Sequence, residues 1–187
     1  MMKPFLILQL RPEDEASDDE FAAILRFGGL EACETRRIRL DRDPLPHLNV
    51  TDYAGVIVGG GPGCVSDDPA DKTDVDARAE AACLSLMPQI TQNDHPFMGC
   101  CYGIGILAHH LGADVSKAQF GEEVSAATCH MTDDGHADPL THGLPSQFDA
   151  FVGHKEAVQH LPDGAVHLLR GDLCPFQMIR YKSNVYA

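Results

Sequence analysis

The stretch "HPFMGCCYGIGILAHHLGA", residues 95–113, decides the fold. Its first part, residues 95–100, is a short apolar run typical of a buried strand. A helical pattern begins at residue 103, the second of two glycines that flank a pair of cysteines. A strand that passes into a helix at a tight turn is half of a βαβ unit, so this stretch predicts a parallel sheet.

The same alternation precedes this stretch. Further strands are predicted at residues 5–10, 35–40 and 53–61. One helix is predicted to be capped by Ser17 or Asp18, with Glu20 completing a capping box, and to end at Gly28–Gly29. A second helix is predicted over residues 71–90, up to Pro88. The predicted fold class is therefore α/β, an open, mostly parallel twisted sheet flanked by helices.

The remainder of the chain is richer in β-structure. Short strand candidates separated by turn signals such as "DDG" and "LPDG" predict an antiparallel extension of the sheet. No internal repeat, low-complexity segment or linker interrupts the sequence. We therefore expect residues 1–187 to form a single domain.

Composition and charge exclude several classes of function. The chain carries 28 acidic and 14 basic side chains, a net charge of −14, which argues against binding nucleic acid or an anionic membrane surface. No apolar run is long enough to span a bilayer, and the first strand lacks a signal-peptide cleavage site. Seven cysteines without a C-x-x-C pair make a disulfide framework or a zinc site unexpected. A reducing, cytoplasmic location is expected.

The pair Cys100–Cys101 is the first candidate for chemistry. Gly99 and Gly103 lie two residues on either side of Cys101, as small residues do around a nucleophile on a strand-to-helix corner. Cys101 would then cap the helix, where the helix dipole would lower its pKa, and the N–H of Tyr102 could donate to an oxyanion. Cys100 is predicted to be a buried strand residue. A structural turn without catalysis fits the same pattern.

The glycine loop in "VIVGGGPGCVSDD", residues 56–68, is the second candidate. Its backbone N–H groups could complete an oxyanion hole, although an ordinary Gly/Pro turn would look the same. No phosphate-binding G-x-x-x-x-G-K-[ST] motif is present. Cys64 in this loop has no neighbouring base and is interpreted as incidental.

Together these stretches resemble the class I (triad) glutamine amidotransferases, especially stand-alone proteins similar to the amidotransferase domain of GMP synthase. The resemblance runs from about residue 53 to the end and includes "GVIVGGGPGCVSDD", "PFMGCCYGIGILAHHLGADV" and "CPFQMIRYKSNVYA". It implies a flavodoxin-like sheet and hydrolysis of the glutamine side-chain amide through a cysteine thioester. Cys101 would be the nucleophile, with oxyanion donors from Tyr102 and from Gly60 or Gly61.

The resemblance also implies which residues bind glutamine and that the reaction needs no cofactor or metal. No cofactor and no metal are expected, and no pair of histidines has metal-ligand spacing. The residues expected to contact the substrate are Gly61, Tyr102, Gly105, Gly153, His154 and Lys155.

Two departures from the family pattern stand out. Gly105 and Ile104 replace a Gln and a common His, so the pocket loses a polar recognition group. The family's F-H-P-E motif, with the catalytic His and Glu, would be expected just beyond Ala187. We expect the C-terminal end of the domain to be missing from this sequence; loss of the base is the alternative. His109 and His110 are predicted to point away from Cys101, and His154 is the remaining substitute base.

Three hypotheses follow. The first is a glutamine amidotransferase or glutaminase-type hydrolase, with a possible ammonia-accepting synthetase as partner. The second, suggested by Gly105, is a cysteine hydrolase of another amide or γ-glutamyl compound. The third is a catalytically inert domain that binds a partner.

Overall fold

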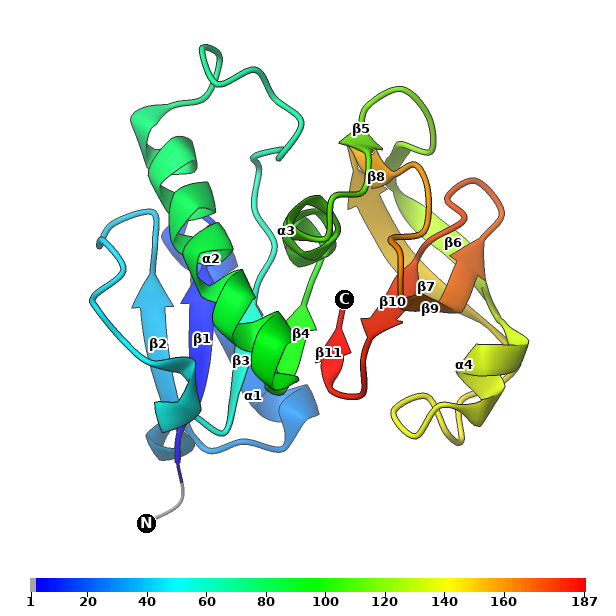
Figure 1. The fold of residues 1–187 in the computed structure, drawn as a ribbon, viewed down its shortest axis with the longest axis horizontal. Helices are drawn as coiled ribbons and strands as arrows, with labels where there is room; N and C mark the ends of the chain where they lie inside the picture. The colour runs from blue at the N-terminus through cyan, green and yellow to red at the C-terminus, as the bar shows by residue number, and fades with distance from the viewer. Residues whose placement is uncertain (1–2) are drawn as a thin grey trace.

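The computed structural model of the protein describes residues 3–187 and is built on a nine-stranded sheet (Figure 1). A separate two-stranded sheet joins β5 (Val115–Ser116) to β8 (Ala157–Val158). The order across the large sheet is β2 (Thr35–Arg39), β1 (Phe5–Gln9), β3 (Gly55–Val58), β4 (Phe97–Gly99), β11 (Val185–Tyr186), β10 (Met178–Tyr181), β9 (Ala165–Gly171), β6 (Glu122–Met131) and β7 (Gln147–His154).

The first five strands in this order, β2 to β11, run parallel to one another. Figure 1 shows helix α2 (Asp74–Asn93) in front of this part of the sheet and α1 (Asp14–Gly28) behind it. Helix α3 (Tyr102–His110) packs against α2. This arrangement confirms the predicted α/β fold with a parallel sheet between helices. No helix among residues 3–187, even the 20-residue α2, is long and apolar enough to cross a membrane.

The main apolar core lies between the parallel strands and α2 and α3. Leu6 and Leu8 of β1 are fully buried, as are Met87 and Ile90 of α2 and Ile106 of α3. Each such side chain stabilises the fold by about 1.5–3 kcal/mol relative to its exposed state. Central parallel strands are covered on both faces, which explains the continuous apolar run of β1.

The other four strands form the antiparallel extension that the sequence predicts. β10 pairs with β9, β9 with β6, and β6 with β7, each antiparallel. The fully buried side chain of Asp138 ties this part together, because its carboxylate accepts hydrogen bonds from Arg180 Nε at 2.6 Å and Tyr186 Oη at 3.2 Å. Asp138 follows the short helix α4 (Asp133–Ala137), which the sequence analysis did not predict.

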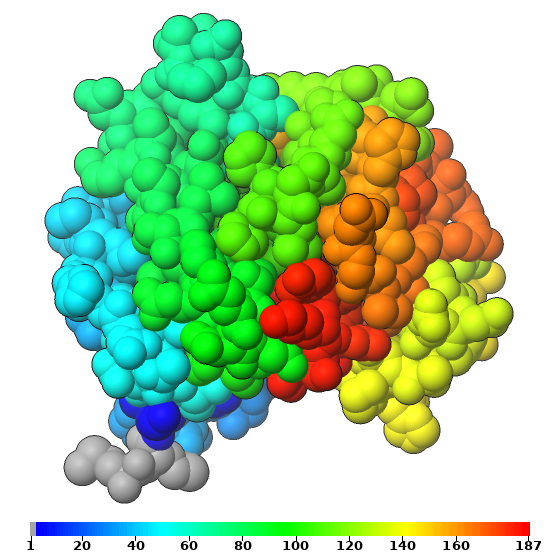
Figure 2. Space-filling view, viewed as in Figure 1, coloured from blue at the N-terminus to red at the C-terminus, as the bar shows by residue number. Residues whose placement is uncertain are grey.

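β11 joins the two parts of the sheet. Val185 pairs in parallel with Phe97 of β4, while Tyr186 pairs antiparallel with Arg180 of β10. Figure 2 shows this segment, in red, between the green helical region and the orange strands. Short 3-10 turns at η1 (Ala32–Glu34) and η2 (Val50–Asp52) complete the described elements.

The predicted cap of the first helix is wrong. α1 begins at Asp14, one turn earlier than expected, with Glu13 as its N-cap residue. Ser17 therefore lies inside the helix, is fully buried, and accepts a hydrogen bond from Arg37 Nη2 at 3.0 Å. The end of the helix is as predicted, because Gly29 adopts a left-handed conformation with φ of 63°.

The predicted end of the second helix is also wrong, because α2 continues through Pro88 to Asn93. Proline inside a helix costs about 3 kcal/mol relative to alanine. Pro88 itself faces solvent, whereas Met87, Ile90 and Thr91 on either side of it are buried. Burial of that apolar face offsets the lost backbone hydrogen bond, and propensity alone could not reveal it.

Candidate active site

The site lies where β1, β3 and β4 end, because the carboxyl ends of parallel strands meet at one edge of a sheet. A cavity of about 930 Å³ opens there, between the parallel strands and the ends of β6 and β7. It borders Cys101 and all six residues predicted to contact substrate, namely Gly61, Tyr102, Gly105, Gly153, His154 and Lys155. Residues from three distant segments of the chain are thus brought to one wall.

Cys101 lies at a sharp corner between β4 and α3. It is the N-cap residue of α3, with φ of 53° and ψ of −97°, a conformation that L-residues rarely adopt. Holding a residue there costs about 1–3 kcal/mol and is typical of functional sites. An alanine side chain at Gly99 would lie 2.7 Å from the carbonyl carbon of Gly103, so the corner requires glycine at position 99. At Gly103 the nearest contact would be 3.4 Å, a weaker requirement than predicted.

Cys100 is not the buried strand residue that the sequence analysis predicts. β4 ends at Gly99, and the side chains of both Cys100 and Cys101 are exposed to solvent. The backbone N–H of Cys100 still donates to Val58 O at 2.8 Å, which continues the ladder for one residue while the side chain turns outward. Exposure therefore does not distinguish the two cysteines. The backbone conformation and the contact with the N–H of Tyr102 single out Cys101.

The pKa of Cys101 is raised, contrary to the prediction that its position would lower it. Desolvation by the surrounding protein is the largest cause, and the carboxylates of Glu20 and Glu156 add to it. The Arg11 guanidinium and the N–H of Tyr102 act in the opposite direction without overcoming it. At neutral pH the group is therefore mainly a thiol, and a base must remove its proton before it attacks a carbonyl.

The glycine loop after β3 runs beside Cys101. A side chain at Gly60 would come within 3.4 Å of the Cys101 Cβ atom. The N–H of Gly60 donates to Glu20 Oε1 at 2.9 Å, and this carboxylate also accepts from Arg11 Nε at 3.1 Å. Gly60 is therefore already engaged, whereas the N–H of Gly61 has no hydrogen bond among the described residues. Of the two predicted loop donors, Gly61 is the free one.

Glu156 fastens the next part of this loop to the cavity wall. Its carboxylate accepts hydrogen bonds from the N–H groups of Val65 and Ser66, both at 2.9 Å. The same side chain fills the space beside Gly105, where an alanine Cβ would lie 3.0 Å from Glu156 Oε1 and 2.8 Å from Val65 Cγ2. The position at which the family carries Gln is therefore closed by Glu156 and Val65.

The side chain of Tyr102 points away from the nucleophile. Its hydroxyl donates to Glu80 Oε2 at 2.9 Å, and burial raises the pKa of Tyr102. Glu80 pairs with Lys72 at 2.7 Å, and Lys72 also donates to the carbonyl of Val65 at 3.1 Å. These contacts link α3 and α2 to the loop at Val65, and it is the backbone N–H of Tyr102 that contacts Cys101.

No histidine hydrogen-bonds to Cys101 within residues 3–187. His154 uses both ring nitrogens elsewhere, with Nδ1 2.9 Å from the carbonyl oxygen of Glu156 and Nε2 3.0 Å from Glu122 Oε2. His110 Nε2 contacts Thr91 Oγ1 of α2 at 3.0 Å, and His109 is exposed.

Sequence reasoning missed Arg11, Glu20 and Glu156. A signal existed for Glu20, since the S-x-x-E spacing marked it, but the spacing was interpreted as a capping box. Because α1 begins earlier, Glu20 reaches across to the glycine loop instead. Arg11 and Glu156 carried no signal, because their partners are distant in sequence.

Known proteins share both the sequence pattern and the fold of this chain. A family model described as glutamine amidotransferase class-I matches residues 22–187. A GMP synthase [glutamine-hydrolyzing] from Lactobacillus delbrueckii subsp. bulgaricus is 31% identical over 162 residues, which is 81% of this chain and 28% of that protein. The chain spans less than a third of the length of the curated relatives it matches.

Solved structures agree with this match at the level of the fold. A glutamine amidotransferase from Thermotoga maritima superimposes with a TM-score of 0.77 at 17% identity, covering 100% of this chain and 74% of that one. A glutamine amido transferase from Methylobacillus flagellatus gives 0.73 at 24% identity, covering 97% and 67%.

Gly99→Ala should destabilise the protein by about 1–3 kcal/mol, because the new methyl group meets backbone that cannot move without opening the corner. Gly103→Ala should change the free energy of unfolding by less than about 1 kcal/mol, since it only makes ordinary contacts and favours the helix. Urea denaturation of the two variants measures the difference. Equal destabilisation by both would contradict the asymmetry of the corner.

Alkylation of Cys101 by iodoacetamide should have its pH midpoint above that of a free cysteine, because only the thiolate reacts and desolvation disfavours it. In a Cys100→Ser background, Arg11→Gln should move the midpoint upward and Glu20→Gln downward. Mass spectrometry of the peptide that contains Cys101 reports the rate at each pH. A midpoint below that of free cysteine, or shifts of the same sign, would refute this account of the electrostatics.

Proposed function

Because the chain belongs to the class I glutamine amidotransferase family, we propose that it hydrolyses the side-chain amide of glutamine and releases ammonia. In this proposal residues 1–187 belong to one amidotransferase domain in which Cys101 is the nucleophile. The backbone N–H groups of Tyr102 and Gly61 serve as the oxyanion donors. The match to a family model over most of the chain supports the reaction class, and the geometry of the corner supports the roles of these residues.

The reaction divides into two steps. In the first, the thiolate of Cys101 attacks the δ-carbon of glutamine, and the carbonyl oxygen becomes an oxyanion that accepts hydrogen bonds from the two N–H groups. The C–N bond then breaks as the nitrogen gains a proton, ammonia leaves, and a γ-glutamyl thioester remains. In the second, water adds to the thioester, the C–S bond breaks, and glutamate and the free thiol are released.

One observation carries the proposal, namely the strained conformation of Cys101 at the N-terminus of α3. Such strain is typical of a nucleophile held with its side chain toward a cavity and its neighbour's N–H toward the developing charge. The raised pKa of Cys101 requires a general base. The proposal assigns this role to none of the histidines of the chain, since none contacts Cys101 within residues 3–187.

The released ammonia needs an acceptor. The relative from Lactobacillus delbrueckii is named both a synthase and glutamine-hydrolysing, and this chain matches 28% of its length. We infer that a synthetase, on a partner or a longer chain, consumes the ammonia. A cytoplasmic location suits this role, and all seven cysteines are free thiols, as in a reducing compartment.

A second candidate function follows from Gly105. Because Glu156 and Val65 fill the space at this position, no side chain there can hydrogen-bond to a bound glutamine. A missing hydrogen bond of this kind weakens binding by about 0.5–3 kcal/mol. Hydrolysis of another amide or γ-glutamyl compound by the same cysteine is therefore the alternative.

In a parent protein that releases ammonia from glutamine, Cys101→Ala should lower this rate by more than about 10³-fold, because it removes the nucleophile itself. Cys100→Ala, the matched control one residue away, should keep the activity near that of the parent chain. A chloroketone analogue of glutamine should also alkylate the parent and Cys100→Ala but not Cys101→Ala. Equal ammonia release by the parent and Cys101→Ala would refute the catalytic role.

Among glutamine, asparagine and a set of γ-glutamyl amides, glutamine should have the highest kcat/KM. The KM for glutamine should be higher than in family members that carry Gln at the position of Gly105, because Gly105 offers the substrate no polar side-chain contact. Product formation measured for each compound at several concentrations gives the ranking. A γ-glutamyl amide that ranks above glutamine would replace the first candidate by the second while leaving the role of Cys101 intact.

A further inference from the structure

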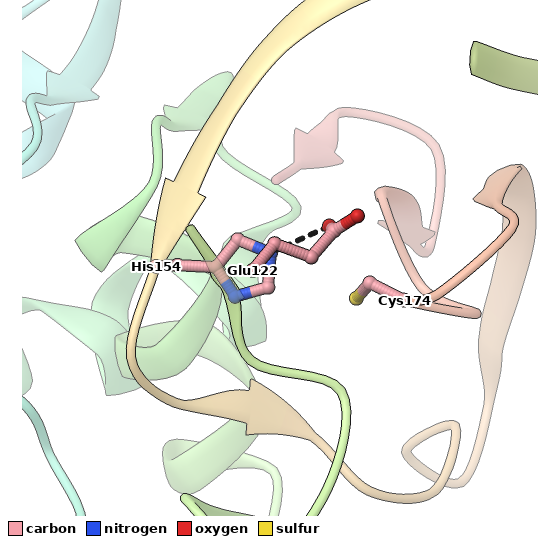
Figure 3. Close-up of side chains that lie close together, drawn as sticks. All are labelled: Glu122, His154 and Cys174. Atoms are coloured by element: carbon pink, nitrogen blue, oxygen red, sulfur yellow. Dashed lines mark hydrogen bonds and ion pairs between the residues drawn. The ribbon is translucent and has the colours of Figure 1, made fainter. Parts of the chain in front are cut away.

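Three side chains with metal-ligating atoms converge on the wall of the cavity (Figure 3). Glu122 begins β6, His154 ends β7, and Cys174 lies between β9 and β10. Glu122 and His154 are directly paired across the two strands, and the ligating atoms of all three residues lie within 4.8 Å of one another. The residues are far apart in sequence, so their spacing did not suggest a site.

The hydrogen bonds of His154 indicate which of its two ring nitrogens carries the proton. Its Nδ1 lies 2.9 Å from the carbonyl oxygen of Glu156, which can only accept, so Nδ1 carries the proton. In the neutral ring Nε2 then presents a lone pair, 3.0 Å from the carboxylate oxygen Oε2 of Glu122. Two acceptors that face each other at this distance need a proton or a bound cation between them.

Burial of the Glu122 carboxylate makes the need for a proton or a cation beside it stronger. The side chain of Glu122 is 3% exposed and Cys174 is 2% exposed. Among the described residues Glu122 forms no ion pair with lysine or arginine, and its other side-chain partner is the neutral amide of Gln177, at 2.6 Å. A buried carboxylate without a cation is unfavourable, so this group is a strong ligand for one.

The donor set selects the kind of cation. One thiolate sulfur, one imidazole nitrogen and one carboxylate oxygen are the ligands of Zn²⁺ rather than of Mg²⁺ or Ca²⁺. Ligands of a tetrahedral zinc ion lie about 3.3–3.8 Å apart, which small side-chain rotations would reach from the present distances. The hydrogen bond from Nδ1 to a backbone carbonyl is the outer contact that zinc-binding histidines usually make.

We propose that Glu122, His154 and Cys174 bind one zinc ion in the cavity wall and leave its fourth position open to the cavity. All three residues border this cavity, which Cys101 also borders. The site includes neither the nucleophile nor the oxyanion donors of the proposed hydrolysis, although His154 is also one of the residues expected to contact the substrate. It would give the antiparallel part of the molecule a metal-dependent link between β6, β7 and the loop before β10.

Cobalt(II) is the probe for this site, because a tetrahedral cobalt thiolate site has visible absorption and a sulfur-to-metal charge-transfer band. The full chain, stripped with a chelator, should bind one equivalent of Co²⁺ with both features, and Zn²⁺ should displace it. Cys174→Ser should abolish the charge-transfer band, and Glu122→Gln should weaken binding at least tenfold.

Matched variants distinguish this site from the other thiols. Cys64→Ser removes a buried cysteine of the same cavity, and Cys101→Ser removes the nucleophile; both should keep the band. A band that disappears in Cys101→Ser instead would assign the metal to the corner and overturn the proposal. Absence of one-equivalent binding by the parent chain would also overturn it. Circular dichroism of each variant verifies folding, and Glu122→Gln remains decisive if Cys174→Ser does not fold.

Discussion

The close approach of two backbone segments, at Gly99 and Gly103, is the constraint on which the rest of the site depends. There is no room for a methyl group at Gly99, since it would lie 2.7 Å from the carbonyl carbon of Gly103. This approach lets α3 begin immediately after β4, and so holds Cys101 in its strained conformation with positive φ. The thiol, the N–H of Tyr102 and the glycine loop then meet at the carboxyl edge of the sheet without any long connecting segment.

Acidic side chains hold the loops around this corner. The Glu20 carboxylate accepts a hydrogen bond from the N–H of Gly60, and the Glu156 carboxylate accepts hydrogen bonds from the N–H groups of residues 65 and 66. Each carboxylate satisfies backbone donors that would otherwise need water. The same charges oppose ionisation of Cys101, so the site gains a fixed loop geometry and loses part of its tendency to form a thiolate. A share of the net charge of −14 is thus structural, not merely solvating.

Patterns that act locally were sufficient to predict most of the fold. The alternation of apolar runs and helical segments predicted the parallel sheet and its antiparallel extension, and the glycines around Cys101 predicted the corner. Predictions failed where distant parts of the chain decide the outcome. Burial of one face carries α2 past Pro88, and the early end of β4 turns Cys100 outward. The role of Glu20 depends on a loop 40 residues away, which no local pattern reports.

The position of β11 in the sheet has a consequence for the order of folding. It pairs with β4 on one side and β10 on the other, and it comes later in the sequence than every other strand. Strands within the parallel part and within the antiparallel part can pair with one another as the chain emerges from the ribosome. Continuous hydrogen bonding between them must wait for residues 185 and 186. Since long-range strand pairing forms slowly, the edge of β4 stays unpaired until then and is a surface on which a nascent chain would aggregate.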